Sequence, residues 1–271
     1  MTKALVKKYY AECGIKEWKR LAKNPYNRLE FDTTMHFLKK YLPKKGLILD
    51  AGGGPGRYTI ELARLGYDVV LLDLTPELLE IARERVKKEK ANGRVNQIIQ
   101  GSIDDLSMLE DSSFDAVICL GGALSHIVNE KQRKKAVNEL VRVAKKNAPI
   151  FVSVIGRLAL CMNSINFLWR EMLRAPDVYR RFTIKGDYFG GYGFSPTHFY
   201  SPEELKKEFE NKVRVLEMVG LEGIFSTHEK RYNQVYKLKK YNKILWETHL
   251  KTCTEPSIVG IGEHFMIICK K

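Results

Sequence analysis

The 271-residue sequence predicts a doubly wound α/β fold, and three observations lead to that prediction. Short apolar runs alternate with helix-period stretches between residues 46 and 155, which is the pattern of βαβ units. The apolar run at 47–50 ends in a cluster of glycines that leads directly into a helix. Later runs repeat this order, so successive strands should lie parallel with right-handed crossovers.

Each expected strand is a short apolar run that ends in turn residues. The first five strands are expected at 47–50, 68–73, 95–100, 114–120 and 149–155. The run at 114–120 is apolar enough to be buried on both faces, as parallel strands are. Two later strands, at 212–219 and 264–269, would complete a seven-stranded, mostly parallel, Rossmann-like sheet.

Helix boundaries are indicated by capping residues. Thr75 followed by Pro76 begins one helix, Asn129 begins a second, and the capping box at 201–204 begins a third. Further helices are expected at 57–65, 158–173 and 232–250.

The order of elements divides the chain into three parts. Residues 1–42 form a helical N-terminal segment, and residues 43–156 with 201–271 form the core, with a helical insertion near 220–262. Residues 157–200 interrupt the α/β rhythm and are expected to be a cap insertion.

The composition is that of a globular protein, with 44% hydrophobic and 29% charged residues. The formal net charge of +14 has two interpretations. It could attract an anionic partner such as nucleic acid, an acidic metabolite or a membrane face. It could equally be a lysine-rich solvated surface, and the even spread of basic residues along the chain favours this second interpretation.

Several classes of protein are disfavoured by what the sequence lacks. No apolar stretch is long enough for a membrane span, and the N-terminus lacks the hallmarks of a signal peptide, so a cytoplasmic protein is expected. The five cysteines include no Cys-x-x-Cys pair and the six histidines no His-Glu-x-x-His arrangement. Neither a disulfide framework nor a metal site is therefore expected. The sequence gives no oligomeric state.

The most informative segment is the turn at 50–57, Asp-Ala-Gly-Gly-Gly-Pro-Gly-Arg. A strand that ends in glycines and leads into a helix lets the backbone approach a ligand closely. The dinucleotide fingerprint begun at Gly52 requires glycine where Arg57 stands, and a P-loop requires a Gly-Lys-Ser/Thr ending that is absent here. The pattern that remains is Asp-x-Gly-x-Gly-x-Gly.

This turn resembles motif I of the class I S-adenosylmethionine-dependent methyltransferase superfamily. The form Gly-Gly-Gly-Pro-Gly-Arg-Tyr-Thr is typical of a small-molecule, methyltransferase type 11-like branch. Other segments that look like this branch are residues 17–21, 29–31, 100–106, 114–122, 141–149 and 255–265. The resemblance covers most of the chain and implies S-adenosylmethionine as cofactor, with the segment 1–42 as a lid over the donor.

The expected cofactor contacts follow from the chemistry of S-adenosylmethionine and from the resemblance. Arg57 can pair with its carboxylate, Asp50 can favour its ammonium or sulfonium, and Asp73 can accept its ribose hydroxyls. By the resemblance, Asp104 receives the adenine amino group and Ile103 packs on the ring, although Asp104 could instead be a helix N-cap. The remaining expected contacts are Tyr26, Arg28, Ala51, Gly52, Gly54, Leu74, Ser102 and Leu120.

Methyl transfer is an in-line displacement for which positioning is the main requirement, so a general base is optional. Candidates for a base are His126, His198 and Tyr200, and a structural role fits each of them equally well. Aromatic residues near the N-terminus could cover the cationic donor or simply pack helices together. These residues are Tyr9, Tyr10, Trp18 and Tyr26.

The cap and the 220–262 insertion should build the acceptor pocket. Aromatic residues of the cap suggest a flat or apolar acceptor, or else form the core of the cap itself: Trp169, Tyr188, Phe189, Tyr192, Phe194 and Phe199. The leading hypothesis is a methyltransferase with a small-molecule acceptor. A tRNA or rRNA methyltransferase is the alternative that the charge favours, but an appended RNA-binding domain and an Asn/Asp-Pro-Pro-Tyr-like motif are both missing. A non-catalytic S-adenosylmethionine-binding protein is the third possibility.

Overall fold

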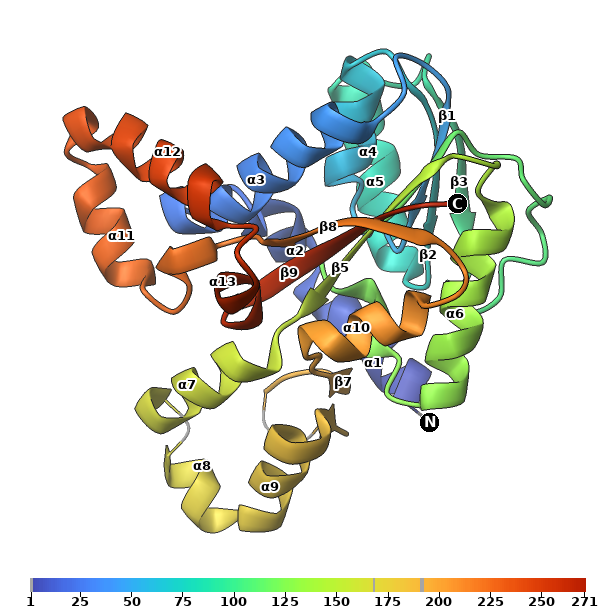
Figure 1. The fold of residues 1–271 in the computed structure, drawn as a ribbon. Coiled ribbons are helices and arrows are strands. Elements are labelled where there is room, and N and C mark those ends of the chain that lie inside the picture. The colour runs from blue at the N-terminus through green and yellow to red at the C-terminus, as the bar shows by residue number, and fades with distance from the viewer. Residues whose placement is uncertain (1, 168, 191–192) are drawn as a thin grey trace.

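The computed structural model describes residues 2–167, 169–190 and 193–271, and it confirms the predicted fold class (Figure 1). A central seven-stranded sheet has the order β3-β2-β1-β4-β5-β9-β8. Strands β1 to β5 are parallel, whereas β9 runs antiparallel to β5 and β8. The strands span Leu47–Ala51 (β1), Asp68–Asp73 (β2), Val95–Gln100 (β3), Ala116–Cys119 (β4), Pro149–Ile155 (β5), Arg214–Gly220 (β8) and His264–Lys270 (β9).

Helices cover both faces of the sheet, and this explains why its central strands are almost entirely apolar. On one face, Leu49 and its neighbours pack against α6 (Glu130–Val143) and α10 (Pro202–Phe209). On the other face, Ile48 packs with α3 (Pro25–Tyr41) and α4 (Arg57–Arg64). Helix α5 (Pro76–Lys88) packs on Leu71 beside α4. Successive residues of β1 therefore point into different cores, as the period of a strand requires.

The capping residues act largely as the sequence indicates. Asn129 accepts a hydrogen bond from the backbone N–H of Gln132, and Ser201 and Glu204 form the expected capping box. Thr75 occupies the N-cap position of α5, but its side chain makes no capping bond. Its backbone N–H instead donates to the carboxylate of Asp73, which belongs to the candidate site described below.

The N-terminal segment forms α1 (Thr2–Cys13) and α2 (Ile15–Arg20) before α3 begins at Pro25. The side chain of Asn24 caps α3 by accepting from the N–H of Asn27. Residues from α1 and α2 contribute to the cavity at the carboxyl ends of the parallel strands. The N-terminal helices thus lie beside the sheet edge where ligands bind in doubly wound folds.

The cap projects from the end of β5, as Figure 1 shows at the bottom of the view. Helices α7 (Arg157–Phe167) and α8 (Trp169–Arg174) occupy the stretch where a helix is expected at 158–173, with residue 168 outside the described residues, and an unforeseen α9 (Pro176–Lys185) follows. A small antiparallel pair, β6 (Asp187–Tyr188) and β7 (Thr197–His198), closes the cap. Helix α9 begins at a proline, a start signal that the sequence prediction overlooked.

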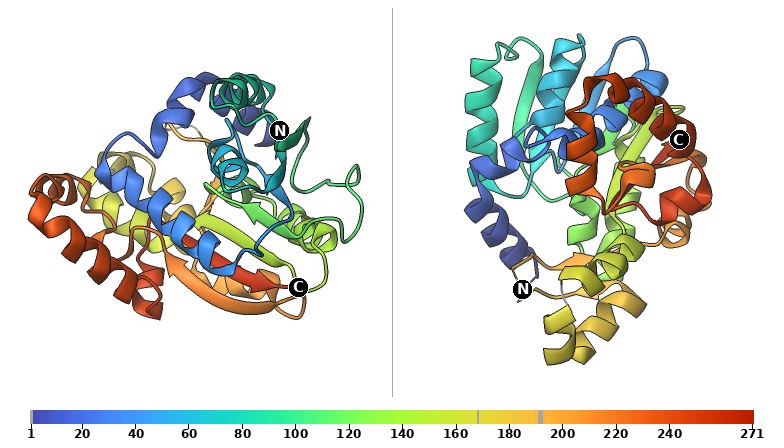
Figure 2. Two further views of the ribbon diagram at one scale, coloured as in Figure 1. Left: turned by 90° about the horizontal axis from the view of Figure 1, so that it is seen from above. Right: turned by 90° about the vertical axis from the view of Figure 1, so that its left-hand side faces the viewer.

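The insertion between β8 and β9 is also broken where one helix was expected. Helices α11 (Glu229–Tyr236) and α12 (Asn242–Thr252) are separated by a short 3₁₀ turn at Lys239–Tyr241, and α13 (Pro256–Gly260) follows. Leu238 has φ −84° and ψ 80°, a backbone conformation that interrupts the helix. The two helices lie alongside α3 in both views of Figure 2, with Tyr232 packed on Tyr26.

Within the described ranges, no helix combines the length and apolarity that crossing a membrane requires.

Candidate cofactor and acceptor site

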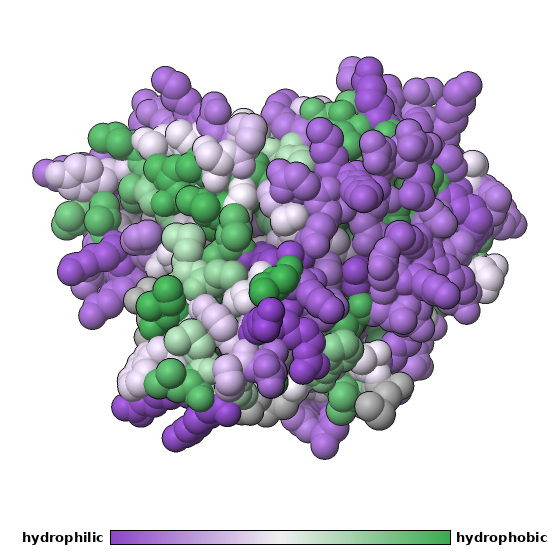
Figure 3. All heavy atoms as spheres, turned by 60° about the horizontal axis from the view of Figure 1, so that its bottom comes forward, coloured by the Kyte–Doolittle hydropathy of each residue, from purple (hydrophilic) through white to green (hydrophobic). Residues whose placement is uncertain are grey.

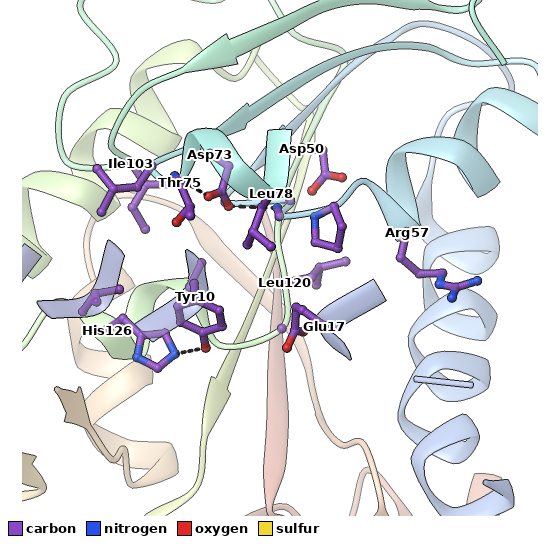
Figure 4. A pocket seen from close by; sticks show the side chains of 18 of the residues that line it. Tyr10, Glu17, Asp50, Arg57, Asp73, Thr75, Leu78, Ile103, Leu120 and His126 are labelled. Carbon is purple, nitrogen blue, oxygen red and sulfur yellow. Dashed lines mark hydrogen bonds between the residues drawn. The ribbon is translucent and has the colours of Figure 1, made fainter. Parts of the chain in front are cut away.

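A cavity lies at the carboxyl ends of β1, β2 and β4, where the strand order reverses. This is the switch point at which doubly wound sheets bind ligands. We call it the donor pocket. One wall is the turn after β1 together with the ends of β2 and β3, and the opposite wall comes from α1 and α2 (Figure 4).

The glycine turn forms the floor of the donor pocket because its backbone takes conformations that other residues avoid. Gly52 has φ +78° and donates its N–H to the carbonyl of Leu72 at 2.6 Å. A Cβ at Gly52 would lie 2.5 Å from the Cβ of Ala123. Gly54 has φ +54°, and its N–H donates to Asp73 Oδ2 at 2.8 Å. The turn thus needs glycine for both conformation and space.

Asp73 is fixed at the end of β2 by two backbone donors. Its Oδ2 accepts from Gly54 N, and its Oδ1 accepts from Thr75 N at 2.8 Å. An ionised carboxylate has about four acceptor positions, so each oxygen can accept one further donor. Burial raises the pKa of this carboxyl. The side chain is positioned to receive a pair of hydroxyl groups from a ligand.

Asp50 carries the clearest unmet hydrogen-bonding capacity in the donor pocket. Its Oδ2 accepts from Thr59 Oγ1 at 2.6 Å, while its buried Oδ1 has no partner among the residues described. Burial raises the pKa of Asp50 to about 7, and the Thr59 hydroxyl partly opposes this rise. A buried polar atom without a partner is costly, so a ligand donor or cation beside Oδ1 would be stabilised.

Arg57 lies at the rim of the pocket, where its guanidinium stacks 3.8 Å from the ring centroid of Trp18 and donates to the carbonyl of Trp18 at 2.5 Å. Its buried Nε has no hydrogen-bond partner in the described part of the chain. Burial lowers the pKa of Arg57. In Figure 4 the side chain of Arg57 points away from Asp50 and Asp73.

The structure brings most of the expected cofactor contacts to one wall. The wall includes Asp50, Gly52, Gly54, Arg57, Asp73, Leu74, Ser102, Ile103 and Leu120. Ala51 is buried in the sheet core beneath the turn. Asp104 lies behind the wall, where its Oδ1 accepts from Lys3 Nζ at 2.6 Å and from Ser102 Oγ at 2.5 Å.

Tyr26 and Arg28 are placed outside the donor pocket, contrary to expectation. The hydroxyl of Tyr26 donates to Glu263 Oε2 at 2.7 Å, and its ring packs on Tyr232. Arg28 is exposed and pairs with Asp32 at 2.8 Å. Both residues belong to the first turn of α3, where Tyr26 faces Tyr232 of the insertion between β8 and β9, and the guanidinium of Arg28 stacks on Phe31.

Several residues of the opposite wall carry no recognisable motif. They are Lys3, Val6, Glu17 and Arg20, whereas Tyr10 in the same wall is one of the aromatic residues that, from the sequence, could cover the donor. The resemblance at residues 17–21 was the available signal for Glu17 and Arg20, although it assigned them no role. Lys3 and Val6 could not be identified in advance, because only the docking of α1 brings them to the pocket.

Tyr10 and His126 form a hydrogen-bonded pair between the two walls (Figure 4). Tyr10 Oη lies 2.6 Å from His126 Nε2, and His126 Nδ1 lies 3.1 Å from the carbonyl oxygen of Pro196. Because a carbonyl oxygen only accepts, we assign the proton to Nδ1, and Nε2 then accepts from the Tyr10 hydroxyl. Burial lowers the pKa of His126 to about 4, so the imidazole is neutral at pH 7.

The other two candidate bases lie away from the cavity, at the base of the cap. His198 Nδ1 bonds Asp187 Oδ1 at 2.7 Å, and its ring meets Tyr200 edge-on with centroids 4.6 Å apart. The buried hydroxyl of Tyr200 has no hydrogen-bond partner within the described ranges. The structure therefore gives both residues a packing role where the cap joins β5.

A second cavity, which we call the acceptor pocket, adjoins the donor pocket. The two share Tyr10, Glu17, Arg20 and Gly121 in their walls. They enclose about 1000 Å³ (donor) and 1590 Å³ (acceptor) of empty space, open mouths included.

Aromatic side chains of the cap line the acceptor pocket, but not all of those expected. Tyr188, Phe194 and Phe199 lie in its wall, joined by Tyr179 and Phe182 of the unforeseen α9. Trp169 and Phe189 are exposed, and Tyr192 lies outside the described residues. Figure 3, viewed from the cap side, shows hydrophobic surface mainly on the left and a mostly hydrophilic surface on the right.

A network of charged groups underlies the junction of the two pockets. Arg20 contacts Glu17 at 2.9 Å and Glu30 at 2.6 Å, and His264 Nδ1 contacts Glu222 at 2.8 Å. Burial opposes the charging of His264, but Glu30 and Glu222 raise its pKa to about 9. Glu30, Glu222 and His264 bring ligand atoms within 4.8 Å of one another, a spacing that a metal could use. Here Arg20 and the protonated imidazole already neutralise these carboxylates.

Comparisons with known proteins agree with this fold. Residues 48–147 match the model of a family described as a methyltransferase domain. A glycine/sarcosine N-methyltransferase of Parasynechococcus marenigrum is 32% identical over 51% of this chain and 48% of its own length. A ubiquinone biosynthesis O-methyltransferase of Xanthomonas oryzae is 30% identical over 50% of this chain and 55% of its own. The chain spans about half the length of the curated relatives it matches.

Two solved structures share the whole fold. An S-adenosylmethionine-dependent methyltransferase of Methanosarcina mazei covers 87% of this chain and 96% of its own, with TM-score 0.59 and 21% identity. A Thermotoga maritima protein, described as a possible histamine N-methyltransferase, covers 98% of this chain and 99% of its own, with TM-score 0.58 and 18% identity.

The fold and the polar pocket at its switch point define a Rossmann-like, ligand-binding α/β protein. More particularly, residues 48–147 match a methyltransferase domain, and solved structures with this fold are described as S-adenosylmethionine-dependent methyltransferases, which points to S-adenosylmethionine as the group to test in this pocket. The residues of the donor pocket fit this group. Asp73 has free acceptor positions for hydroxyl groups. Asp50 Oδ1 and Arg57 Nε have no partner among the described residues, so the first could accept from a donor or cation and the second could donate to an anion.

Proposed function

We propose that this protein transfers a methyl group from S-adenosylmethionine to a small-molecule acceptor by in-line displacement. The observation that carries the proposal is the meeting of two pockets at Tyr10, Glu17, Arg20 and Gly121. One pocket has the polar groups that a nucleoside needs, and the other is walled mainly by apolar side chains. Two ligands bound there would meet at the junction, and positioning of that kind lowers the barrier to a bimolecular reaction.

In this proposal each part of the cofactor has a partner in the donor pocket. Asp73 holds the ribose hydroxyls, Ile103 packs on adenine, Asp50 holds the ammonium and Arg57 holds the carboxylate. Asp104 acts indirectly, because its bond to Lys3 ties α1 to the adenine side of the pocket. When bound, S-adenosylmethionine supplies an electrophilic methyl group on a sulfonium.

The protein's own residues then exclude water and orient the acceptor. Residues 1–42 act as a lid, because α1 and α2 supply one wall of the donor pocket. Residues 157–200 act as the cap over the acceptor, while 43–156 and 201–271 form the core. His126 is a positioning residue that fixes the hydroxyl of Tyr10, a residue in the walls of both pockets.

The names of the relatives favour a small molecule over RNA. Those relatives are described as acting on glycine or sarcosine and in ubiquinone biosynthesis. An RNA methyltransferase remains the second candidate because of the net charge of +14. All five cysteines are free thiols, which agrees with a reducing, cytoplasmic location.

The experiment that tests this function uses methyl-labelled S-adenosylmethionine and fractionated cell extract. We expect label to enter the small-molecule fraction and to disappear when Asp73 is replaced by alanine. Label in RNA would favour the second candidate. Tight cofactor binding with no label transferred in any fraction would indicate a non-catalytic binding protein.

A further inference from the structure

We infer that the acceptor is an amine, bound through its ammonium group against the acidic side of the acceptor pocket and through its apolar part against the aromatic side. This inference names the acceptor class of the proposed methyltransferase and therefore rests on that proposed function. Two independent features of the acceptor pocket carry it, the arrangement of its rings and the excess of carboxylates at its base.

Aromatic rings line the acceptor pocket in two groups of ring contacts. Tyr9 meets Phe194 edge-on with centroids 5.6 Å apart, and Tyr179 meets Phe182 edge-on at 5.1 Å. Phe182 in turn meets Phe199 at 6.3 Å. The negatively polarised faces of such rings attract ammonium groups and pack well on flat or apolar groups.

The carboxylates at the base of the pocket outnumber the cations. Arg20 and His264 are the cationic side chains of the wall, and both are already engaged by Glu30, with Glu222 also bonded to His264. Glu17 and Glu263 lie in the same wall. Burial raises the pKa of Glu222. Even with Glu222 protonated, three carboxylates face two cations, so the base of the pocket is negative.

Glu263 is the group that best fits a ligand ammonium. Its Oε1 accepts from Asn163 Nδ2 at 2.8 Å, and its Oε2 accepts from the Tyr26 hydroxyl at 2.7 Å. Both partners are neutral, and the carboxylate forms no ion pair with any described residue. The two neutral donors fix its orientation without cancelling its charge. An approaching cation would therefore be attracted, and a carboxylate or phenolate would be repelled.

Methylation of an amine requires no reactant other than S-adenosylmethionine and a water molecule that accepts the proton. The bound ammonium first loses a proton to water. The neutral nitrogen then forms a bond to the methyl carbon as the carbon–sulfur bond of the sulfonium breaks. The products are a methylated ammonium and neutral S-adenosylhomocysteine, and the same carboxylates that attract the substrate also neutralise the product.

The test measures binding by calorimetry with the full chain saturated with S-adenosylhomocysteine. The probes are benzylamine, 2-phenylethylamine and 3-phenylpropylamine, each compared with its alcohol, and 3-phenylpropanoate serves as the anionic probe. We expect at least one amine to bind about tenfold or more tightly than its alcohol, and the propanoate to bind most weakly. Glu263→Gln should remove that preference, whereas the control Glu110→Gln, which removes an exposed carboxylate outside both pockets, should keep it.

The outcomes separate this inference from the proposed function. Failure of S-adenosylhomocysteine to bind would contradict the proposed function itself. If it binds but no amine does, or if alcohols or the propanoate bind as tightly as the amines, the amine inference is overturned and the methyltransferase proposal stands. A Glu263→Gln variant that keeps both its cofactor affinity and its preference for the amine would overturn it as well.

Discussion

The donor and acceptor pockets share a boundary, yet they are built in opposite ways. The two carboxylates assigned to the cofactor, Asp50 and Asp73, come from one short stretch of chain, and backbone N–H groups of Gly54 and Thr75 hold Asp73. The acceptor pocket draws its walls from α1, the cap and the start of β9, and side-chain packing holds them. A local motif therefore determines cofactor chemistry, whereas acceptor chemistry depends on how distant segments pack together.

The largest expected effect lies in the donor pocket, at Asp73. Asp73→Ala removes the acceptor of two backbone N–H groups and of the proposed ribose hydroxyls. We expect affinity for S-adenosylmethionine to fall roughly a hundredfold or more, because hydrogen bonds to charged groups contribute about 1.5–3 kcal/mol each. Calorimetry measures this, with Asp105→Ala, an exposed carboxyl three residues past the pocket's Ser102, as control. Unchanged affinity would refute the ribose assignment.

The next effect is a pH dependence of cofactor affinity, which arises at Asp50 because burial raises the pKa of its carboxyl to about 7. Above pH 7 the carboxylate is ionised and can hold the cofactor ammonium, and below pH 7 it is protonated and cannot. Affinity for S-adenosylmethionine should thus weaken about tenfold from pH 8 to pH 6. Asp50→Asn should bind weakly at both values.

The stability of the free protein should change in the opposite sense. A carboxyl whose pKa is raised in the folded state favours folding at low pH, and that contribution is lost as pH rises through about 7. The melting temperature of the free protein should therefore be lower at pH 8 than at pH 6. Asp50→Asn should reduce this difference. A wild-type affinity that is flat across this range would show that Asp50 does not hold the ammonium.

A smaller effect is expected at the boundary of the pockets. Tyr10→Phe removes the only donor assigned to His126 Nε2 and leaves that buried atom unpaired. The free energy of unfolding should fall by about 1–3 kcal/mol, which thermal or denaturant unfolding can measure. A variant as stable as the parent chain would indicate that water replaces the tyrosine and that the pair does not fix the boundary.

The smallest effect is expected within the cap base, at Tyr200. Its buried hydroxyl has no described partner, so Tyr200→Phe should leave cofactor affinity unchanged and stability within about 1 kcal/mol of the parent or slightly higher. Removal of a tyrosine hydroxyl would then lower stability at position 10 but not at position 200. A large loss of methyl transfer in Tyr200→Phe would restore its candidacy as a catalytic residue.

The sequence allowed the sheet and the donor wall to be predicted because each rests on local patterns. The strands at 68–73, 95–100 and 149–155 have the expected bounds, and the glycine turn leads into α4 at Arg57 as expected. The breaks at Leu238 and before Pro176 were not foreseen, since helical periodicity continues across the first and the proline start was overlooked at the second.

Other features depend on packing that a sequence does not display. Tyr26 faces the 221–262 insertion because Tyr232 and Glu263 lie beside it, and Asp104 is tied to Lys3, about a hundred residues away. Arg20, His264 and their carboxylates also come from distant segments, namely α2, α3, the turn after β8 and the start of β9. Such contacts between distant segments decide which polar residues reach a pocket.

A crystal structure of the protein with S-adenosylhomocysteine tests the central claim most directly. We predict the nucleoside at the ends of β1 and β4, with both ribose hydroxyls on the Asp73 carboxylate and the thioether sulfur directed toward Tyr10 and Gly121. Density for the nucleoside at any other place, or a ribose that leaves Asp73 untouched, would contradict the account.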